Sequence, residues 1–354
     1  MAALGAGVSG NRFLTGVGWR LAYFSGYARL MQRRTGGAGV ILRFERVCPA
    51  RSGPFQPRRA HEITPQFLDS AIRALKRWKF EFVSIGDVPQ RANRPASPRR
   101  FICLTFDGAT RDVITSAYPV LARHGVPFTV YVPTAFPDGL GEAWWLALEA
   151  VIARNDRIAL MMDGKERRFE VVATPDKYGL YDFLHRWMRS LAPSELSTAI
   201  NDLCRRYSVD LRALSREASM DWDDLATLGA DPNVTIASMT VNAPVLASLK
   251  EAAASREMLM GRAVIESALH RDVAHFAYPF GDRDSFHRHH VMLAGQAGFA
   301  SAVTALPGVV LADGRSNLHA LPRIGWDGRQ RSLRMMRVML SGVMLPKPQR
   351  HGRA

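Results

Sequence analysis

LTFDGA, at Leu104–Ala109, closes an apolar, β-rich run that begins at Arg100. A run of this length and composition predicts a buried strand, and Asp107 then stands at its carboxyl end. In a parallel α/β barrel the carboxyl ends of the strands form the face on which catalytic groups are built. Asp107 is therefore a candidate catalytic carboxylate, although an Asp in this place is also a common helix N-cap.

Similar apolar runs recur along the chain and alternate with segments of helical period. Strands that alternate with helices in this way predict βαβ units and a parallel sheet. About seven such strands predict an α/β fold, a distorted parallel (β/α) barrel. The predicted strands are 39–47, 80–85, 100–106, 128–132, 234–238, 275–278 and 300–305, and the predicted helices among them are 64–78, 110–123, 251–269 and 287–297.

One region breaks the alternation. Residues 138–230 have helical patterns almost throughout, interrupted by one predicted hairpin with Asp163-Gly164 at its turn. We interpret this region as a helical insertion in one barrel connection, serving as a lid, as a partner surface or only as packing. The predicted organisation is a basic N-terminal segment at 1–38, a barrel at 39–328 and a basic C-terminal helix and tail at 329–354.

The formal charge of +15 is concentrated at the two ends of the sequence. Residues 1–60 hold ten Arg and one acid, and residues 329–354 hold six Arg, one Lys and no acid. Basic ends attract anionic lipid, nucleic acid or acidic glycan, or they are simply solvated. Because the sequence has no nucleic-acid-binding signature, no specific nucleic acid is expected.

Both ends also contain amphipathic patterns. The apolar stretch 13–31 is interrupted by Arg20 and Arg29, so it is too polar to span a bilayer and predicts a helix against the body or a membrane surface. Near the other end, Arg residues recur every third position from 331 to 337 among apolar residues. This pattern predicts a helix that either lies on a membrane or packs on the barrel with its Arg stems covering the edge.

The three cysteines, Cys48, Cys103 and Cys204, are far apart and form no metal-binding or disulfide pattern. A reducing compartment fits this use of cysteine. We therefore expect a cytoplasmic protein, with a peripheral location at the inner membrane as the alternative that the basic ends suggest.

Four blocks of sequence follow one another in a recognisable order. Together they resemble the polysaccharide deacetylase family, the nodulation protein B homology domain of carbohydrate esterase family four, over roughly residues 39–327. The resemblance implies the family's barrel and a chitooligosaccharide deacetylase-like activity. The blocks are LTFDGA with HGVPFTVYV at His124–Val132, VTIASMTVNAPVL at Val234–Leu246, FAYPFGD at Phe276–Asp282, and the late segments GF at Gly298-Phe299 and LPRI at Leu321–Ile324.

The resemblance also implies a chemistry. Family members use a strand-end Thr-Phe-Asp-Asp, whose first Asp is a general base and whose second Asp joins two His in holding a divalent metal such as zinc. That metal polarises an acetamide carbonyl and lowers the pKa of bound water to about 7. Asp107 matches the base, but Gly108 stands at the Asp ligand position, and Met239 and Ala243 stand at the two His positions. These residues supply no usable donor, so we expect no metal cofactor.

Other residues match the family's remaining roles. Phe280 matches the aromatic residue whose backbone N–H faces the oxyanion, and Tyr278 lies beside it as a substrate-contacting candidate. His319 matches a late His that acts as general acid, while a His that caps or lines a strand is the alternative. His275 begins a predicted strand, the wrong end for catalysis.

Two further groups have two interpretations each. His287, His289 and His290 form a loop after the third block that is either a replacement metal site or a helix start. Trp144-Trp145 and Trp326, together with Tyr278 and Phe280, either stack on sugar rings or belong to the core.

Two functions follow. One is a hydrolase acting on the acetamide bonds of an N-acetylated oligosaccharide, polysaccharide or glycolipid precursor. The other is a catalytically inactive pseudoenzyme that keeps the barrel and serves as a glycan-binding or regulatory subunit. The order of the blocks favours the first, and the substituted metal positions favour the second.

Overall fold

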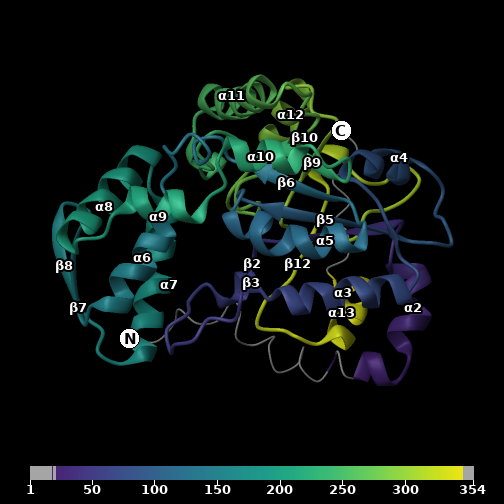
Figure 1. Ribbon diagram of the computed structural model, residues 1–354, viewed down its shortest axis with the longest axis horizontal. Helices are drawn as coiled ribbons and strands as arrows, with labels where there is room; N and C mark the ends of the chain where they lie inside the picture. Colours follow the sequence, from purple (N-terminus) through teal and green to yellow (C-terminus); the bar gives the residue numbers. More distant parts are fainter. Residues whose placement is uncertain (1–17, 19–20, 346–354) are drawn as a thin grey trace.

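A parallel sheet forms the centre of the molecule (Figure 1). The computed structural model describes residue 18 and residues 21–345. Seven strands pair in the order β11-β10-β9-β6-β5-β1-β12 and curl through 245° into a half-barrel, and the short β4 pairs with β5. The predicted distorted barrel of about seven strands is thereby confirmed. The strands are β1 (Gly39–Phe44), β4 (Glu81–Phe82), β5 (Phe101–Asp107), β6 (Phe128–Val132), β9 (Val234–Ser238), β10 (His275–Ala277), β11 (Ser301–Val303) and β12 (Ile324–Gly325).

Helices cover the outside of the sheet (Figure 1). They follow the predicted positions closely, with two exceptions. The short α4 was not predicted, and a π-helical turn at Val113–Ala117 precedes α5, where one continuous helix is predicted. The covering helices are α3 (Pro65–Arg77), α4 (Val88–Asn93), α5 (Tyr118–His124), α10 (Trp222–Gly229), α11 (Glu251–Leu269) and α12 (Arg288–Gln296).

Two apolar layers hold the sheet in place. Because side chains alternate across a strand, β5 sends Ile102, Leu104 and Phe106 toward the outer helices and Phe101 and Cys103 toward the barrel interior. All seven residues of β5 are buried, as expected for a central parallel strand. The interior is thus a packed core and the strand ends define its two faces.

The segment between β6 and β9 forms the helical insertion, at the left of Figure 1. It has an apolar core of its own, which includes Trp144, Leu148 and Leu184. Asp163 and Gly164 both have positive φ (51° and 75°) at the hairpin turn, as a tight two-residue turn requires. The elements are α6 (Trp144–Arg154), β7 (Arg157–Met162), β8 (Lys165–Glu170), α7 (Thr174–Ser190), α8 (Pro193–Arg206) and α9 (Leu211–Ala218).

Two terminal helices, α2 (Tyr27–Thr35) and α13 (Leu333–Leu340), meet at the amino end of the barrel. The Thr35 hydroxyl donates to the Ser341 carbonyl (2.7 Å), and Met336, Val338 and Leu340 are buried, so α13 packs on the barrel. Among the described residues no helix is long and apolar enough to cross a membrane. The remaining parts of the predicted ends, 1–17, 19–20 and 346–354, lie outside the described residues.

Candidate functional site

The carboxyl ends of the strands place three predicted residues at one end of the barrel. Asp107 is the last residue of β5, Met239 directly follows β9, and Phe280 lies three residues beyond β10. The parallel registers Asp107↔Tyr131 and Val132↔Ser238 keep these strand ends level. We call this end of the barrel, together with the segment 45–62 that β1 feeds into, the mouth.

Asp107 is held by a buried arginine that the sequence interpretation did not assign to the site. The two terminal nitrogens of Arg323 donate to the two carboxylate oxygens of Asp107, at 2.6 and 2.7 Å. Nε of Arg323 donates to the Thr304 carbonyl (2.7 Å), and one terminal nitrogen also reaches the Thr105 hydroxyl (3.2 Å). Arg323 is 0 % exposed. Since two-point pairs of this kind are strong and directional, both oxygens of Asp107 are engaged.

The three positions that would hold a metal present no donor. Gly108 has no side chain, Ala243 has only a methyl group, and Met239 packs inside the barrel with Tyr131 and Ala277. Within the part of the chain that the structure describes, no three His, Cys, Asp or Glu side chains gather as a metal site. The residues present do not fit the family's divalent metal.

Tyr278 is not available to a substrate. It is fully buried, its ring stacks on Phe286 at 4.4 Å, and its hydroxyl donates to the His319 carbonyl (2.8 Å). The prediction of a substrate contact at Tyr278 is therefore wrong, because the side chain points into the helix-covered side of the sheet. Phe280 has φ 60° and lies at the mouth, with the Arg189 guanidinium 4.4 Å from its ring.

His319 is also separated from Asp107. Leu321 pairs with Val303 in parallel, so His319 lies level with Ser301, the first residue of β11. Its Nε2 lies 2.8 Å from the carbonyl oxygen of Phe299, which precedes that strand. The structure therefore corrects the predicted general acid. His319 lies at the amino end of β11, and Asp107 ends β5 at the opposite end.

The remaining histidine candidates have structural roles. His290 is completely buried, and its Nδ1 accepts a hydrogen bond from the His287 N–H (2.9 Å) at the start of α12. Burial and the two neighbouring histidines lower the pKa of His290 to about 4. This is the helix-start interpretation of the loop. His275 is buried at the amino end of β10, as expected from the sequence.

The aromatic candidates divide between core and mouth. Trp144 is buried in the core of the insertion, and Trp326 stacks on Phe67 at 5.5 Å in the barrel core. Trp145 is only partly buried, and the Arg58 guanidinium lies 5.8 Å from its ring. Of the three tryptophans, Trp145 is the one at the mouth.

A second charged group at the mouth, centred on Glu45, was not predicted from the sequence. Glu45 follows β1 as Asp107 ends β5, and the pairing Phe44↔Phe106 brings the two acids to the same level. Arg43 lies between them, 3.1 Å from Glu45 and 3.8 Å from Asp107, and His61 Nδ1 lies 2.7 Å from Glu45. Burial alone would raise the pKa of Glu45, but the Arg43 and His61 charges hold it well below its usual range. The rule that singled out Asp107, an acid at the end of a strand, did not find Glu45 because the strand was predicted as 39–47, whereas β1 ends at Phe44.

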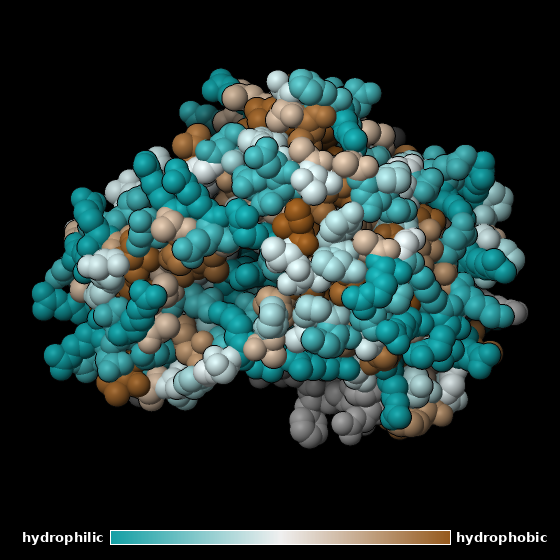
Figure 2. All heavy atoms as spheres, in the orientation of Figure 1, coloured by the Kyte–Doolittle hydropathy of each residue, from teal (hydrophilic) through white to brown (hydrophobic). Residues whose placement is uncertain are grey.

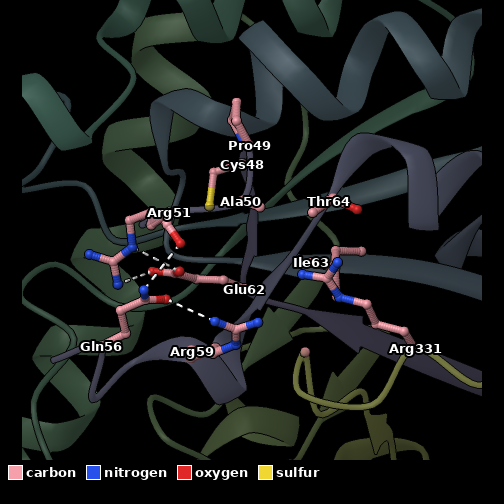
Figure 3. Close-up of a pocket in the computed structure, with 11 residues that line it drawn as sticks. Cys48, Pro49, Ala50, Arg51, Gln56, Arg59, Glu62, Ile63, Thr64 and Arg331 are labelled. Atoms are coloured by element: carbon pink, nitrogen blue, oxygen red, sulfur yellow. Dashed lines mark hydrogen bonds and ion pairs between the residues drawn. The ribbon is translucent and has the colours of Figure 1, made fainter. Parts of the chain in front are cut away.

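A small pocket lies on the rim of the mouth, beside the short strands β2 (Arg46–Val47) and β3 (Glu62–Ile63) (Figure 3). Arg51 spans it, donating to Glu62 at 3.0 Å and to Glu149 of α6 at 2.8 Å, and thereby ties the rim to the insertion. Burial, followed by the nearby Glu62 charge, raises the pKa of the Cys48 thiol to about 11. The pocket is lined by Cys48, Pro49, Ala50, Arg51, Gln56, Arg59, Glu62, Ile63, Thr64, Gly328 and Arg331.

Comparisons with known proteins agree on the fold. No protein-family model matches the chain, and no curated protein matches it. Among solved structures, the Streptococcus pyogenes deacetylase PplD in complex with acetate matches with a TM-score of 0.55 at 14% identity, over 85% of this chain and 97% of that chain. A de-N-acetylase from Aggregatibacter actinomycetemcomitans gives 0.54 at 12%, over 85% and 98%. A polysaccharide deacetylase from Bacillus cereus gives 0.53 at 12%, over 85% and 68%.

These identities establish the fold and nothing finer. The protein is an α/β half-barrel of the architecture found in polysaccharide deacetylases. The chain has the fold of these enzymes, and at its mouth the carboxylate of Asp107 is bound at both oxygens by Arg323.

Proposed function

We propose that this protein is a glycan-binding member of the deacetylase fold that does not carry out metal-dependent deacetylation. The fold supports a glycan as the ligand, since its neighbours include a polysaccharide deacetylase. One observation carries the second part. Asp107, the only acid left of the predicted set, has both oxygens bound by Arg323.

A catalytic metal needs about three protein ligands to be retained and to lower the pKa of its water. Here Gly108, Met239 and Ala243 donate nothing. Without the ion, water keeps its high pKa and the acetamide carbonyl stays unpolarised. Each 1.4 kcal/mol of lost transition-state stabilisation slows the reaction about tenfold.

The test combines metal analysis, catalysis and binding. After dialysis against zinc or cobalt, elemental analysis is expected to find less than about 0.1 ion per chain, while calorimetry detects binding of N-acetylglucosamine oligomers. Acetate release from the same oligomers should stay at background with and without chelator. Stoichiometric metal, or acetate release that is abolished by chelator, would contradict the proposal and support a metal-dependent hydrolase. Absence of binding to any oligomer would reject the glycan ligand.

A second proposal concerns the amino end of the barrel, where an exposed apolar surface fits an anionic membrane. Leu21 and Phe24, in the short helical segment before the left-handed Gly26, are 65 and 69 % exposed, and Tyr27 and Leu30 of α2 are 49 and 76 % exposed. The Arg334 guanidinium of α13 lies 5.6 Å from the Phe24 ring. An apolar ridge flanked by arginines is the pattern of helices that lie in the bilayer interface.

Charge complementarity supports anionic lipid as the partner. Arg29 and Arg34 are exposed on α2, and the sequence has a formal charge of +15. Each basic residue near an anionic surface contributes about 1 kcal/mol to binding. Because Figure 1 places α2 at the right and the insertion at the left, such contact would leave the mouth facing away from the bilayer.

Vesicle co-sedimentation tests this contact. We expect binding to vesicles containing phosphatidylserine and little binding to pure phosphatidylcholine, with a loss of about tenfold or more for Leu30→Glu. Leu140→Glu is the matched control, because Leu140 is 75 % exposed on the insertion side. Equal loss in both variants would contradict the proposal. A change from dimer to monomer in Leu30→Glu, measured by light scattering, would instead assign the ridge to a second copy of the chain.

A further inference from the structure

Arg58 at the mouth is a cation without an anionic partner. Its guanidinium lies 5.8 Å from the Trp145 ring, and among the described residues no carboxylate comes within 4.0 Å of it. The residue is partly buried, and burial lowers the pKa of its guanidinium below the ordinary value. Charged groups in such surroundings are normally paired.

The acids near Arg58 are already bound by other residues. Glu45 is held by Arg43 and His61, and Asp107 is held by Arg323. On the rim, Arg51 binds both Glu62 and Glu149. These carboxylates are therefore paired with other cations, and none of them forms an ion pair with Arg58.

The acid of the insertion whose charge acts on Arg58 is Glu149 of α6, and Arg51 already binds it. Arg189 of α7 is paired with Asp282 (2.8 Å). His185 stacks on Tyr181, and burial, with the nearby Arg189, His61 and Arg58 charges, lowers its pKa to about 4. His185 is therefore a neutral hydrogen-bonding group near pH 7. In Figure 2 the surface between the insertion and the barrel is largely hydrophilic.

We infer that the mouth binds the anionic group of an acidic sugar, with Arg58 as its counter-ion and the Trp145 ring beside it. A guanidinium binds a carboxylate or a phosphate through two parallel hydrogen bonds, so uronic acids and sugar phosphates share the required chemistry. The Arg58 guanidinium lies over the Trp145 ring, which holds the cation in place at the mouth. The inference rests on the proposed glycan-binding function and narrows its ligand to anionic glycans.

The experiment compares three oligosaccharides of equal length by calorimetry: a neutral N-acetylglucosamine oligomer, one with a uronic acid and one with a 6-phosphate. We expect the wild-type protein to bind one or both anionic oligomers at least about tenfold more tightly than the neutral one, the usual effect of a charge-assisted contact. Arg58→Gln should remove this preference and leave the neutral affinity unchanged. The anionic oligomer that binds more tightly than the neutral one shows whether the site binds a carboxylate or a phosphate.

Arg59→Gln is the matched control. It removes the same charge from the next residue, whose side chain lines the pocket of Figure 3 and donates to Gln56. We expect it to keep the preference for anionic oligomers, and Arg58→Lys to keep part of it. Thermal melting of each variant confirms that it is folded.

The outcomes separate the inference from the proposed function. Equal affinity of the wild-type protein for neutral and anionic oligomers overturns the inference and leaves glycan binding intact. Equal loss in the Arg58 and Arg59 variants also overturns it, since net charge alone would then explain the preference. Inorganic phosphate that binds through Arg58, with no binding of any oligosaccharide, supports the anion site and rejects the glycan function.

Discussion

The two ends of the barrel each bury an arginine, and the two arginines are balanced in different ways. At the mouth, Arg323 pairs with the carboxylate of Asp107 through two hydrogen bonds. At the amino end, Arg100 donates only to backbone carbonyls, those of Gly36 and Leu340. Burial lowers the pKa of Arg100 to about 10. The buried arginine at the mouth is therefore balanced by a carboxylate, and the one at the amino end by peptide carbonyls.

The two buried arginines therefore have different partners: backbone carbonyls at the amino end and a side-chain carboxylate at the mouth. Gly36 caps α2 and Leu340 is the last residue of α13, so Arg100 lies where the carbonyls of two helix C-termini converge. A cation in this place is favoured by both helix dipoles and fastens the terminal helices to the barrel. Asp107 serves no such backbone. Both of its carboxylate oxygens accept hydrogen bonds from the Arg323 side chain.

The largest expected effect comes from rebuilding the metal position at the mouth. Gly108→Asp, Met239→His and Ala243→His together supply three ligands from the segments that follow β5 and β9, without using Asp107. We expect micromolar zinc binding, worth about 8 kcal/mol, where the parent chain binds none. Competition with a chromogenic chelator measures it.

The double variant without the Asp is the control and should bind at least about a hundredfold more weakly, because two ligands do not fix the ion. Gly108 has φ 94°, so the new Asp is introduced at some cost in stability. A folded triple variant that binds no zinc would show that the mouth has been reshaped around the Asp107–Arg323 pair.

Removing Arg323 should come next in size. Arg323→Met removes both hydrogen bonds to the buried Asp107 carboxylate and leaves only Arg43, 3.8 Å away, so we expect a loss of about 3–5 kcal/mol in the free energy of unfolding, measured in urea. Arg323→Met combined with Asp107→Leu should recover most of the loss, because both charges are then gone. If the single variant lowers the free energy of unfolding by less than about 1 kcal/mol, the Arg323–Asp107 pair is not shielded from solvent.

At the amino end the corresponding change should cost less. Arg100→Met loses charged hydrogen bonds to two carbonyls, which amounts to about 2–3 kcal/mol. Hydrogen exchange should rise in α2 and α13, where the freed carbonyls lie. The exposed neighbour Arg99→Met is the control and should change neither stability nor exchange. Exchange that rises over the whole barrel would show that Arg100 stabilises the fold globally.

The sequence predicted the strands and helices because apolar period and turn residues are local signals, as at the Asp163-Gly164 turn. It missed β12, which has two residues. The Arg323–Asp107 pair joins positions 216 residues apart, so no local pattern announces it. Arg323 stands among apolar neighbours in LPRI, and an arginine in such a context requires a counter-ion. The prediction that His319 lies beside Asp107 was wrong because the order of the blocks gives the position of His319 along the chain but does not show at which end of the barrel it lies.

The smallest effect concerns pH and the amino end. Burial lowers the pKa of His275 to about 4 from an ordinary 6.5, and its Nδ1 lies 2.9 Å from the Ser301 hydroxyl. Below pH 6.5 the unfolded chain takes up a proton that the folded chain refuses, so this contribution to stability is present above pH 6.5 and is lost as the pH falls toward 4. Between pH 7.5 and 5 the loss should reach about 2 kcal/mol. Urea unfolding at both pH values measures it, and His275→Gln should reduce the difference by that amount while the exposed His270→Gln leaves it unchanged. An unaltered pH dependence in His275→Gln would mean that His275 takes up its proton as readily in the folded protein as in the unfolded chain.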